Sequence, residues 1–245
     1  MQQNRLYRDL SYLWPRISPR EDHAEDALRW RQELRKRLGP GRHAILELGC
    51  GGGHTLSHLT DEFEAVAVDL SPAMLELSRR LNPGVAHHLG DMRYFRLGRQ
   101  FNAVLIHDAV SYLLSPSDIS STIATARAHL KPGGVLIMNP DWFTETFPGT
   151  SVFHWIRGQG ELELTFIEHL SDPDPEDTTI ESVFLFILKE AGILRVEQDR
   201  HQTGLFSVST WLELMEQGGF QSVRVVYPAY DEGYGGDLLV GVLRS

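Results

Sequence analysis

Cysteine is nearly absent from this 245-residue sequence, which contains only Cys50. A single thiol cannot form a disulfide within the chain, so a disulfide-stabilised scaffold is excluded and we expect a cytoplasmic protein. Long apolar runs are also missing, since no segment approaches the roughly 18 residues that span a membrane. The first residues lack the apolar core of a signal peptide. We therefore expect no membrane association.

Positive charge is scarce as well. The chain has 23 Lys and Arg residues against 33 Asp and Glu residues, a formal net charge of −10. An acidic surface repels phosphates, so a nucleic acid partner is disfavoured. The adjacent His87 and His88 are the nearest approach to a metal-binding pattern, but further ligands are missing beside them. We predict no metal site and a small-molecule partner.

Apolar residues, in contrast, are abundant. They make up 42% of the chain, against 23% charged residues, which is typical of a globular protein. The length suits one large α/β domain with an insertion, or two small domains.

Strand-like and helix-like patterns alternate up to residue 140. The pattern predicts helices over 21–38, 54–60, 72–81 and 118–130 and strands over 44–48, 65–68, 85–89, 103–106 and 135–138. Ser71 followed by Pro72 is a typical helix start, and we interpret 131–134 as a turn. Such alternation predicts a parallel sheet with helices on both faces.

The pattern changes after residue 140. Strands are predicted in direct succession over 162–170, 178–188 and 193–203, then a helix over 209–217 and a final strand pair. We expect four regions: an N-terminal lid and helix (1–40), a cofactor-binding core (41–150), an antiparallel insert (151–208), and a C-terminal helix and hairpin that complete the core sheet (209–245). The insert is a candidate substrate region, lid or homodimer surface.

Glycine occupies alternate positions after the first predicted strand, at Gly49, Gly51 and Gly53. A turn without side chains lets a ligand lie against backbone N–H groups, here at a helix expected to begin near His54. Asp69 follows Gly49 by twenty positions, at the end of the next strand, where a carboxylate can bind both hydroxyls of a ribose. The combination predicts a nucleoside-containing cofactor.

The glycine spacing distinguishes between such cofactors. The dinucleotide fingerprint G-x-G-x-x-G would require glycine at His54, which disfavours a nicotinamide-dependent dehydrogenase. The G-x-G-x-G pattern after Glu47 instead resembles motif I of class I S-adenosylmethionine (SAM) methyltransferases. That resemblance implies a three-layer Rossmann-like fold with a mostly parallel sheet and an antiparallel last strand, here with an antiparallel β insert. It also implies SAM as cofactor and S-adenosylhomocysteine as product.

The same resemblance assigns cofactor contacts. Asp69 would hold the ribose, and Asp91 would accept from the adenine amino group. Cys50 could be a nucleophile, but the glycines around it and the lack of an evident base favour a small loop residue. The residues implied to contact SAM are Tyr7, Glu47, Gly49, Cys50, Gly51, Asp69, Leu70, Met74, Asp91, Met92 and His107.

A closer resemblance covers most of the chain. Segments 90–104 and 130–147 and the run from Asp199 to Phe206 look like the sugar-amine N,N-dimethyltransferases of macrolide antibiotic biosynthesis. Those enzymes methylate the amine of a nucleotide-linked deoxysugar. The pair His107-Asp108 and Asp141 depart from that pattern, and both positions are expected near the acceptor.

Methyl transfer from a sulfonium mainly requires alignment, but an amine acceptor must be uncharged to attack. His107 is the first candidate for the base, because its ordinary pKa of about 6.5 suits the task; a packing or positioning role beside SAM is the alternative. Tyr7 and Tyr12 lie in the predicted lid. The candidate acceptor-binding residues are Tyr12, Asp108, Tyr112, Trp142, Phe143 and Arg157.

The sequence therefore predicts a SAM-dependent methyltransferase that acts on a small molecule, with an amine as the leading acceptor. An O-methyltransferase acting on a hydroxyl or carboxylate would have the same fold and cofactor residues. A non-catalytic SAM-binding protein is the alternative from another class.

Overall fold

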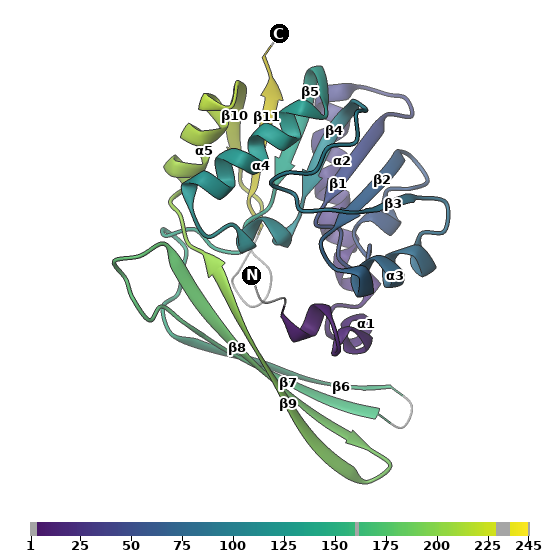
Figure 1. Cartoon of the computed structure of the whole chain (residues 1–245), viewed down its shortest axis with the longest axis vertical. Coiled ribbons are helices and arrows are strands. Elements are labelled where there is room, and N and C mark those ends of the chain that lie inside the picture. The colour runs from purple at the N-terminus through teal and green to yellow at the C-terminus, as the bar shows by residue number, and fades with distance from the viewer. Residues whose placement is uncertain (1–3, 160–161, 229–235, 245) are drawn as a thin grey trace.

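A seven-stranded sheet forms the centre of the computed structural model, which describes residues 4–159, 162–228 and 236–244. The strand order is β10-β11-β5-β4-β1-β2-β3 (Figure 1). Strands β1 to β5 pair in parallel, and β11 runs antiparallel to both of its neighbours, which confirms the predicted sheet. The strands are β1 (Ala44–Leu48), β2 (Glu64–Asp69), β3 (Ala86–Leu89), β4 (Phe101–Ile106), β5 (Leu130–Met138), β10 (Phe220–Val225) and β11 (Leu238–Leu243).

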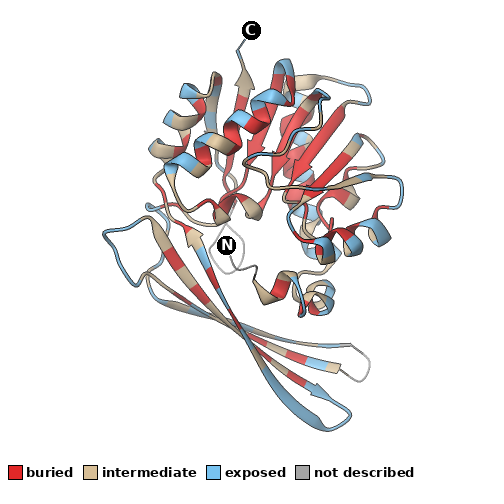
Figure 2. Ribbon diagram, viewed as in Figure 1, coloured by how far each residue is buried: buried red, intermediate tan, exposed pale blue. Residues whose placement is uncertain are grey.

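Helices cover both faces of this sheet, so its central strands are buried (Figure 2). All five residues of β1 are buried, as expected for an apolar strand of a parallel sheet. One face packs against α2 (Ala24–Leu38) and α3 (Pro72–Leu81), and the other against α4 (Pro116–Ala128) and α5 (Val208–Gln217). The Ser71 hydroxyl accepts a hydrogen bond from the Met74 N–H and caps α3 as predicted.

A separate four-stranded antiparallel sheet extends away from the central sheet (Figure 1). Its strands follow one another in chain order, as β6 (Ser151–Gln159), β7 (Leu162–Ser171), β8 (Thr179–Glu190) and β9 (Ile193–Gly204). The predicted antiparallel insert is therefore present. Its first strand, β6, was missing from the sequence prediction.

The N-terminal segment packs on this second sheet. Leu6, Leu10 and Leu13 are buried together with Leu164 and Phe186 of the insert. The segment contains the 3₁₀-helices η1 (Arg5–Tyr7), η2 (Ser11–Leu13) and η3 (Arg20–His23) and the one-turn helix α1 (Trp14–Ile17). It thus connects the insert to the carboxyl edge of the central sheet. Among the described residues, no helix combines the length and apolar character that crossing a bilayer would require.

Two local predictions were wrong. The helix expected over 54–60 is only a single 3₁₀ turn, η4 (Leu56–His58). The Ser57 N–H makes one i−4 bond to Gly53, but the His58 N–H bonds to Thr55 rather than His54. The His54 carbonyl accepts from the Ser57 hydroxyl instead, so an α-helix does not continue there. The turn expected over 131–134 lies within β5, which begins at Leu130.

Candidate active site

A cavity opens at the carboxyl ends of β1, β2 and β4. Residues of the N-terminal segment and of η5 (Asp108–Tyr112) complete its wall. This is the edge at which open α/β sheets bind their ligands. The lining contains every predicted cofactor residue, together with Asn4, Trp14, His23, Gly52, His54, Thr55, Ser71, Gly90, Asp108, Ala109 and Tyr112.

The glycine turn after β1 is shaped for close approach. Gly49 has a φ of +73°, and a Cβ on it would lie 2.3 Å from the Cβ of Ala109, so only glycine fits. The turn's N–H groups are largely used internally, since Gly49 and Cys50 donate to the Val68 carbonyl and Gly51 donates to Asp69. The predicted row of free N–H donors at a helix N-terminus is therefore absent from the described turn. A pyrophosphate would find little to bind here.

Asp69 ends β2 and connects two loops. Its Oδ2 accepts from the Gly51 N–H at 2.8 Å, and its Oδ1 accepts from the Ser71 N–H at 2.7 Å. Burial raises the pKa of Asp69, while these two N–H groups oppose the shift. Each carboxylate oxygen keeps a lone pair. The carboxylate is thus held in place with acceptor capacity remaining, as the predicted ribose contact requires.

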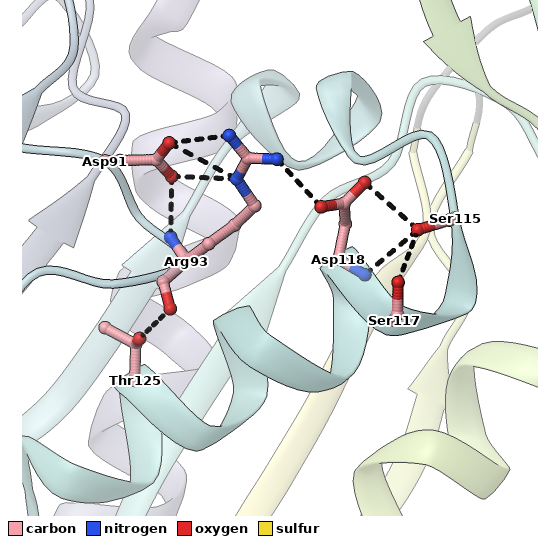
Figure 3. Close-up of polar contacts among 6 residues, drawn as sticks. All are labelled: Asp91, Arg93, Ser115, Ser117, Asp118 and Thr125. Carbon is pink, nitrogen blue, oxygen red and sulfur yellow. Dashed lines mark hydrogen bonds and ion pairs between the residues drawn. The ribbon is translucent and has the colours of Figure 1, made fainter.

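Asp91 is engaged by its neighbour Arg93, as Figure 3 shows. The guanidinium donates to Asp91 at 2.7 and 3.0 Å and to Asp118 of α4 at 2.8 Å. Burial opposes ionisation, but the bonds from Arg93 lower the pKa of Asp91 overall. The network fixes the loop after β3, on which Met92 also lines the cavity. The adenine contact predicted for Asp91 would share oxygens that already bind Arg93.

His107 lies between two carboxylates. Its Nδ1 is 2.6 Å from Oδ1 of Asp108. Its Nε2 is 3.3 Å from Oδ2 of Asp26, but the angle does not allow a hydrogen bond. Burial opposes the charged ring, but the attraction of Asp108 and Asp26 raises the pKa of His107 well above its ordinary value. A protonated ring cannot accept another proton. The geometry supports the positioning role over the base role.

Glu47 lies beneath the same end of the cavity. Its side chain is buried in β1, and its Oε2 has no hydrogen-bond partner in the described part of the chain. Burial raises the pKa of Glu47 to about 8. The carboxyl is thus largely protonated at neutral pH and available to a polar ligand atom.

Three side chains are also close enough together to hold a metal ion. The ligand atoms of His23, Asp26 and His107 all lie within 4.8 Å of one another. Both ring nitrogens of His23, however, already bond to the hydroxyls of Ser18 and Thr55. The absence of a metal stays a prediction.

The candidate acceptor residues separate into two groups. Asp108 and Tyr112 line the cavity. Tyr12 binds Arg195 of the insert through its hydroxyl, and Phe143 is buried in the central core. Trp142 stacks near Phe153 rather than lining the cavity.

Arg157 also lies outside the lining. Its guanidinium donates to Asp22 at 2.8 Å and to the carbonyls of Arg16 and Ile17. The structure therefore uses it to hold the N-terminal segment against β6.

Nine lining residues were not among the predicted site residues, and three of these carry aromatic rings. Trp14 stacks on His54 with ring centroids 6.4 Å apart and covers Gly52, and His23 lies beside His107. The aromatic N-terminal segment was the available signal, but its contact partners lie far along the chain.

The character of the lining separates SAM from a dinucleotide. The described lining contains no Lys or Arg but includes the carboxylates of Asp69, Asp91 and Asp108 and the largely protonated carboxyl of Glu47. Such a cavity suits a ligand that carries cationic sulfonium and ammonium groups. It does not suit the pyrophosphate of a dinucleotide cofactor beside Gly49 and Asp69.

Comparisons with known proteins agree with this geometry. Residues 45–134 match the family described as "Methyltransferase domain". A dTDP-3-amino-3,6-dideoxy-alpha-D-glucopyranose N,N-dimethyltransferase from Streptomyces fradiae is 34% identical over 71% of this chain and 68% of its own length.

Two solved structures are also similar. DesVI from Streptomyces venezuelae is 28% identical with a TM-score of 0.83, covering 97% of this chain and 96% of DesVI. SAM-bound CalS10, an amino pentose methyltransferase from Micromonospora echinaspora, is 26% identical with a TM-score of 0.79, covering 90% and 91%. The chain belongs to the class I SAM-dependent methyltransferases and is similar to their sugar-amine N,N-dimethyltransferases. It is an enzyme that transfers methyl groups from SAM to a small molecule.

Proposed function

We propose that this enzyme methylates the amine of a nucleotide-linked amino deoxysugar, and that it transfers two methyl groups in succession. The observation that carries the proposal is the extent of the similarity. It covers 97% of the chain in DesVI and 90% in the amino pentose methyltransferase, so it includes most of the insert as well as the cofactor core. The Streptomyces fradiae relative is named for an amino sugar and for N,N-dimethylation.

The cavity fits SAM by three independent features. Asp69 keeps free lone pairs for a ribose, Gly49 allows the ligand to approach the main chain, and the buried Glu47 Oε2 lacks a partner within the described residues. SAM supplies an electrophilic methyl group on its sulfonium. The protein must hold donor and acceptor in line and exclude water, and fixed alignment of this kind is worth roughly 7–11 kcal/mol.

We place the acceptor end of the cavity beside Tyr112, a predicted acceptor residue, and beside Tyr7, which was predicted to contact SAM. The hydroxyls of Tyr7 and Tyr112 are 2.7 Å apart, and both residues line the cavity. Hydroxyl oxygens accept hydrogen bonds from an amine and thereby orient its lone pair. This supports an amine as the acceptor.

A paired-substrate assay tests the proposal. The purified enzyme is incubated with SAM and a dTDP-linked 3-amino-3,6-dideoxyhexose, and in parallel with the same sugar bearing a 3-hydroxyl. Mass spectrometry should find one and then two added methyl groups on the amine substrate and none on the hydroxyl substrate. Methylation of the hydroxyl sugar alone would instead identify an O-methyltransferase. Tight SAM binding without turnover of any acceptor would favour a non-catalytic SAM-binding protein.

The insert is also our candidate homodimer surface. Its edge strands expose apolar side chains, among them Val152 and Ile156 of β6 and Ile193 and Val196 of β9. Sedimentation equilibrium of the wild type and of Ile156→Glu tests this directly. A dimer that the substitution dissociates supports the proposal, and a wild-type monomer at micromolar concentration contradicts it. The four-region division and the cytoplasmic location stay predictions.

A further inference from the structure

A chain of hydrogen bonds leads from the acceptor end of the cavity into the insert. The Tyr7 hydroxyl lies 2.7 Å from the Tyr112 hydroxyl, and the Tyr112 hydroxyl lies 2.6 Å from Nδ1 of His201 on β9. His201 Nε2 lies 2.8 Å from Asp199 Oδ2. Asp199 in turn accepts from the Leu6 N–H at 2.7 Å, which closes the path onto η1.

The end of this chain is buried. The side chain of His201 is 1% exposed and that of Asp199 is 7% exposed. The rings of Tyr7 and Phe184 pack against the imidazole, with centroids at 5.4 and 4.4 Å. A buried carboxylate, imidazole and hydroxyl in sequence form the arrangement by which hydrolytic triads activate a hydroxyl, here with tyrosine in the place of serine.

The positions of the protons follow from chemistry. Burial opposes the charge on Asp199, but the bonds from His201 and the Leu6 N–H lower its pKa below the ordinary value, so it is a carboxylate and accepts only. Nε2 of His201 therefore carries a hydrogen, and its Nδ1 is an acceptor. Tyr112 then donates to His201, and Tyr7 must donate to the Tyr112 oxygen.

This polarity leaves the Tyr7 oxygen with lone pairs at the cavity end of the chain. Its hydroxyl hydrogen is committed to Tyr112, and within the described residues it has no other hydrogen-bond partner. An amine in the cavity would therefore meet an acceptor, which orients the nitrogen and can receive its proton.

We propose that Tyr7, Tyr112, His201 and Asp199 form a proton relay, in which His201 receives the proton that the acceptor nitrogen releases during methyl transfer. The nitrogen lone pair forms the N–CH₃ bond while the S–CH₃ bond breaks. The electron pair of the broken S–CH₃ bond stays on sulfur. The nitrogen then gives its proton to Tyr7, whose own proton moves to Tyr112, and the proton of Tyr112 moves to His201 Nδ1. The resulting imidazolium is paired with Asp199.

The relay matters most for a second methyl transfer and in this respect rests on the proposed function. After the first transfer the nitrogen is a protonated secondary amine, which must lose a proton before it can attack again. When product has left the cavity, the proton held by His201 returns to water through the same chain of hydrogen bonds. His201 and Asp199 do not touch the acceptor and are positioning residues.

Few ionisable groups lie close enough to the relay in the described structure to change how its proton transfer depends on pH. The ionisable side chains that face His201 are Tyr7 from η1, Tyr112 from η5 and Asp199 from its own strand, while β8 contributes Ser182 and Phe184. Asp141 and Glu168 act on Tyr112 from farther away, and burial raises the pKa of both Tyr112 and Asp141 well above their ordinary values.

The decisive variant is His201→Asn in the full-length enzyme. The asparagine Oδ1 can still accept from Tyr112, but it cannot take up a proton. We expect kcat at neutral pH to fall by about 10²–10⁴-fold, the usual contribution of a positioned base, with the Kd for SAM unchanged. The deficit should shrink as the pH rises, because solution then supplies the neutral amine. Monomethylated product should accumulate. The control His169→Asn replaces an exposed histidine of β7 and should behave as wild type.

Two results of the His201→Asn experiment would overturn the relay. A wild-type kcat and pH profile in His201→Asn overturns the relay. Loss of kcat to the same extent at every pH, without accumulation of monomethylated product, also overturns it, because that is the behaviour of a merely structural residue. If thermal unfolding shows that His201→Asn does not fold, Tyr112→Phe takes its place. It breaks the chain of hydrogen bonds without altering the insert and is judged by the pH profile of kcat and by the accumulation of monomethylated product. Failure of the proposed function is seen in the wild type itself, which would then not methylate the amino sugar.

Discussion

The two ends of the cavity are built in different ways. At the predicted cofactor end, Asp69 binds N–H groups that lie 18 and 2 residues away. Apart from Tyr7, the predicted contact residues lie at or shortly after the carboxyl ends of β1, β2, β3 and β4. At the end where we propose that the acceptor binds, Tyr7 and Tyr112 are 105 residues apart, and Tyr112 and His201 are 89 residues apart. Cofactor recognition is thus local in sequence, whereas the acceptor end exists only after the N-terminal segment and the insert have docked.

The comparison predicts that variants at the two ends change different quantities. Asp69→Ala should give the largest effect, because it removes two expected ribose bonds to a carboxylate and orphans the N–H groups of Gly51 and Ser71. At about 1.5–3 kcal/mol for each charged hydrogen bond, the Kd for SAM should rise at least about 100-fold. Isothermal titration calorimetry measures this directly.

His201→Asn serves as the matched acceptor-end variant for that experiment. It should leave the Kd for SAM unchanged while kcat falls. Equal losses of SAM affinity in both variants would mean that the two ends are one cooperative unit, and unchanged affinity in Asp69→Ala would remove this residue from the ribose.

The same contrast explains what could be predicted from the sequence. Strand periodicity identified the sheet, and Gly49 and Asp69 identified the edge at which the cavity lies, because the carboxyl ends of neighbouring parallel strands meet at one edge. The contacts of Tyr112 and Arg157 depend on where the insert and the N-terminal segment pack. Such long-range packing leaves no fixed spacing in the sequence. The absence of α-helix after Gly53 was equally hidden, since it depends on the hydroxyl of Ser57.

His107 tests the boundary between the two ends. Its folded-state pKa is raised, so its pairing with Asp26 and Asp108 stabilises the protein fully below the unfolded pKa of about 6.5, and this stabilisation is lost as the pH rises through the folded-state pKa. We expect His107→Asn to lower the free energy of unfolding by about 2 kcal/mol near pH 6. Breaking a fully buried pair costs about 3–5 kcal/mol, but half of the Asp108 side chain is exposed.

Urea denaturation of wild type and His107→Asn between pH 6 and the alkaline range, analysed by linear extrapolation to zero denaturant, checks this expectation. The difference between them should shrink with rising pH. A difference that grows with pH would contradict a charged ring. If His107 is the base instead, kcat of the variant should be lost most at low pH, where the acceptor amine is protonated.

Among these variants, Arg157→Ala is expected to have the smallest effect, and it tests whether this residue contributes to stability or to acceptor binding. Arg157 is a predicted acceptor-binding residue, and its guanidinium could bind a nucleotide phosphate, or it could only fasten the N-terminal segment to the insert. Its bonds to Asp22 and to the carbonyls of Arg16 and Ile17, with its position over the Trp155 ring at 4.5 Å, favour the second role. The Asp22 side chain is 50% exposed, so their ion pair contributes little. Arg157→Ala should lower the free energy of unfolding by about 1 kcal/mol and leave the acceptor KM unchanged. A KM that rises about tenfold or more at constant kcat would instead assign the lost interaction to substrate binding, since uniform binding energy affects KM alone.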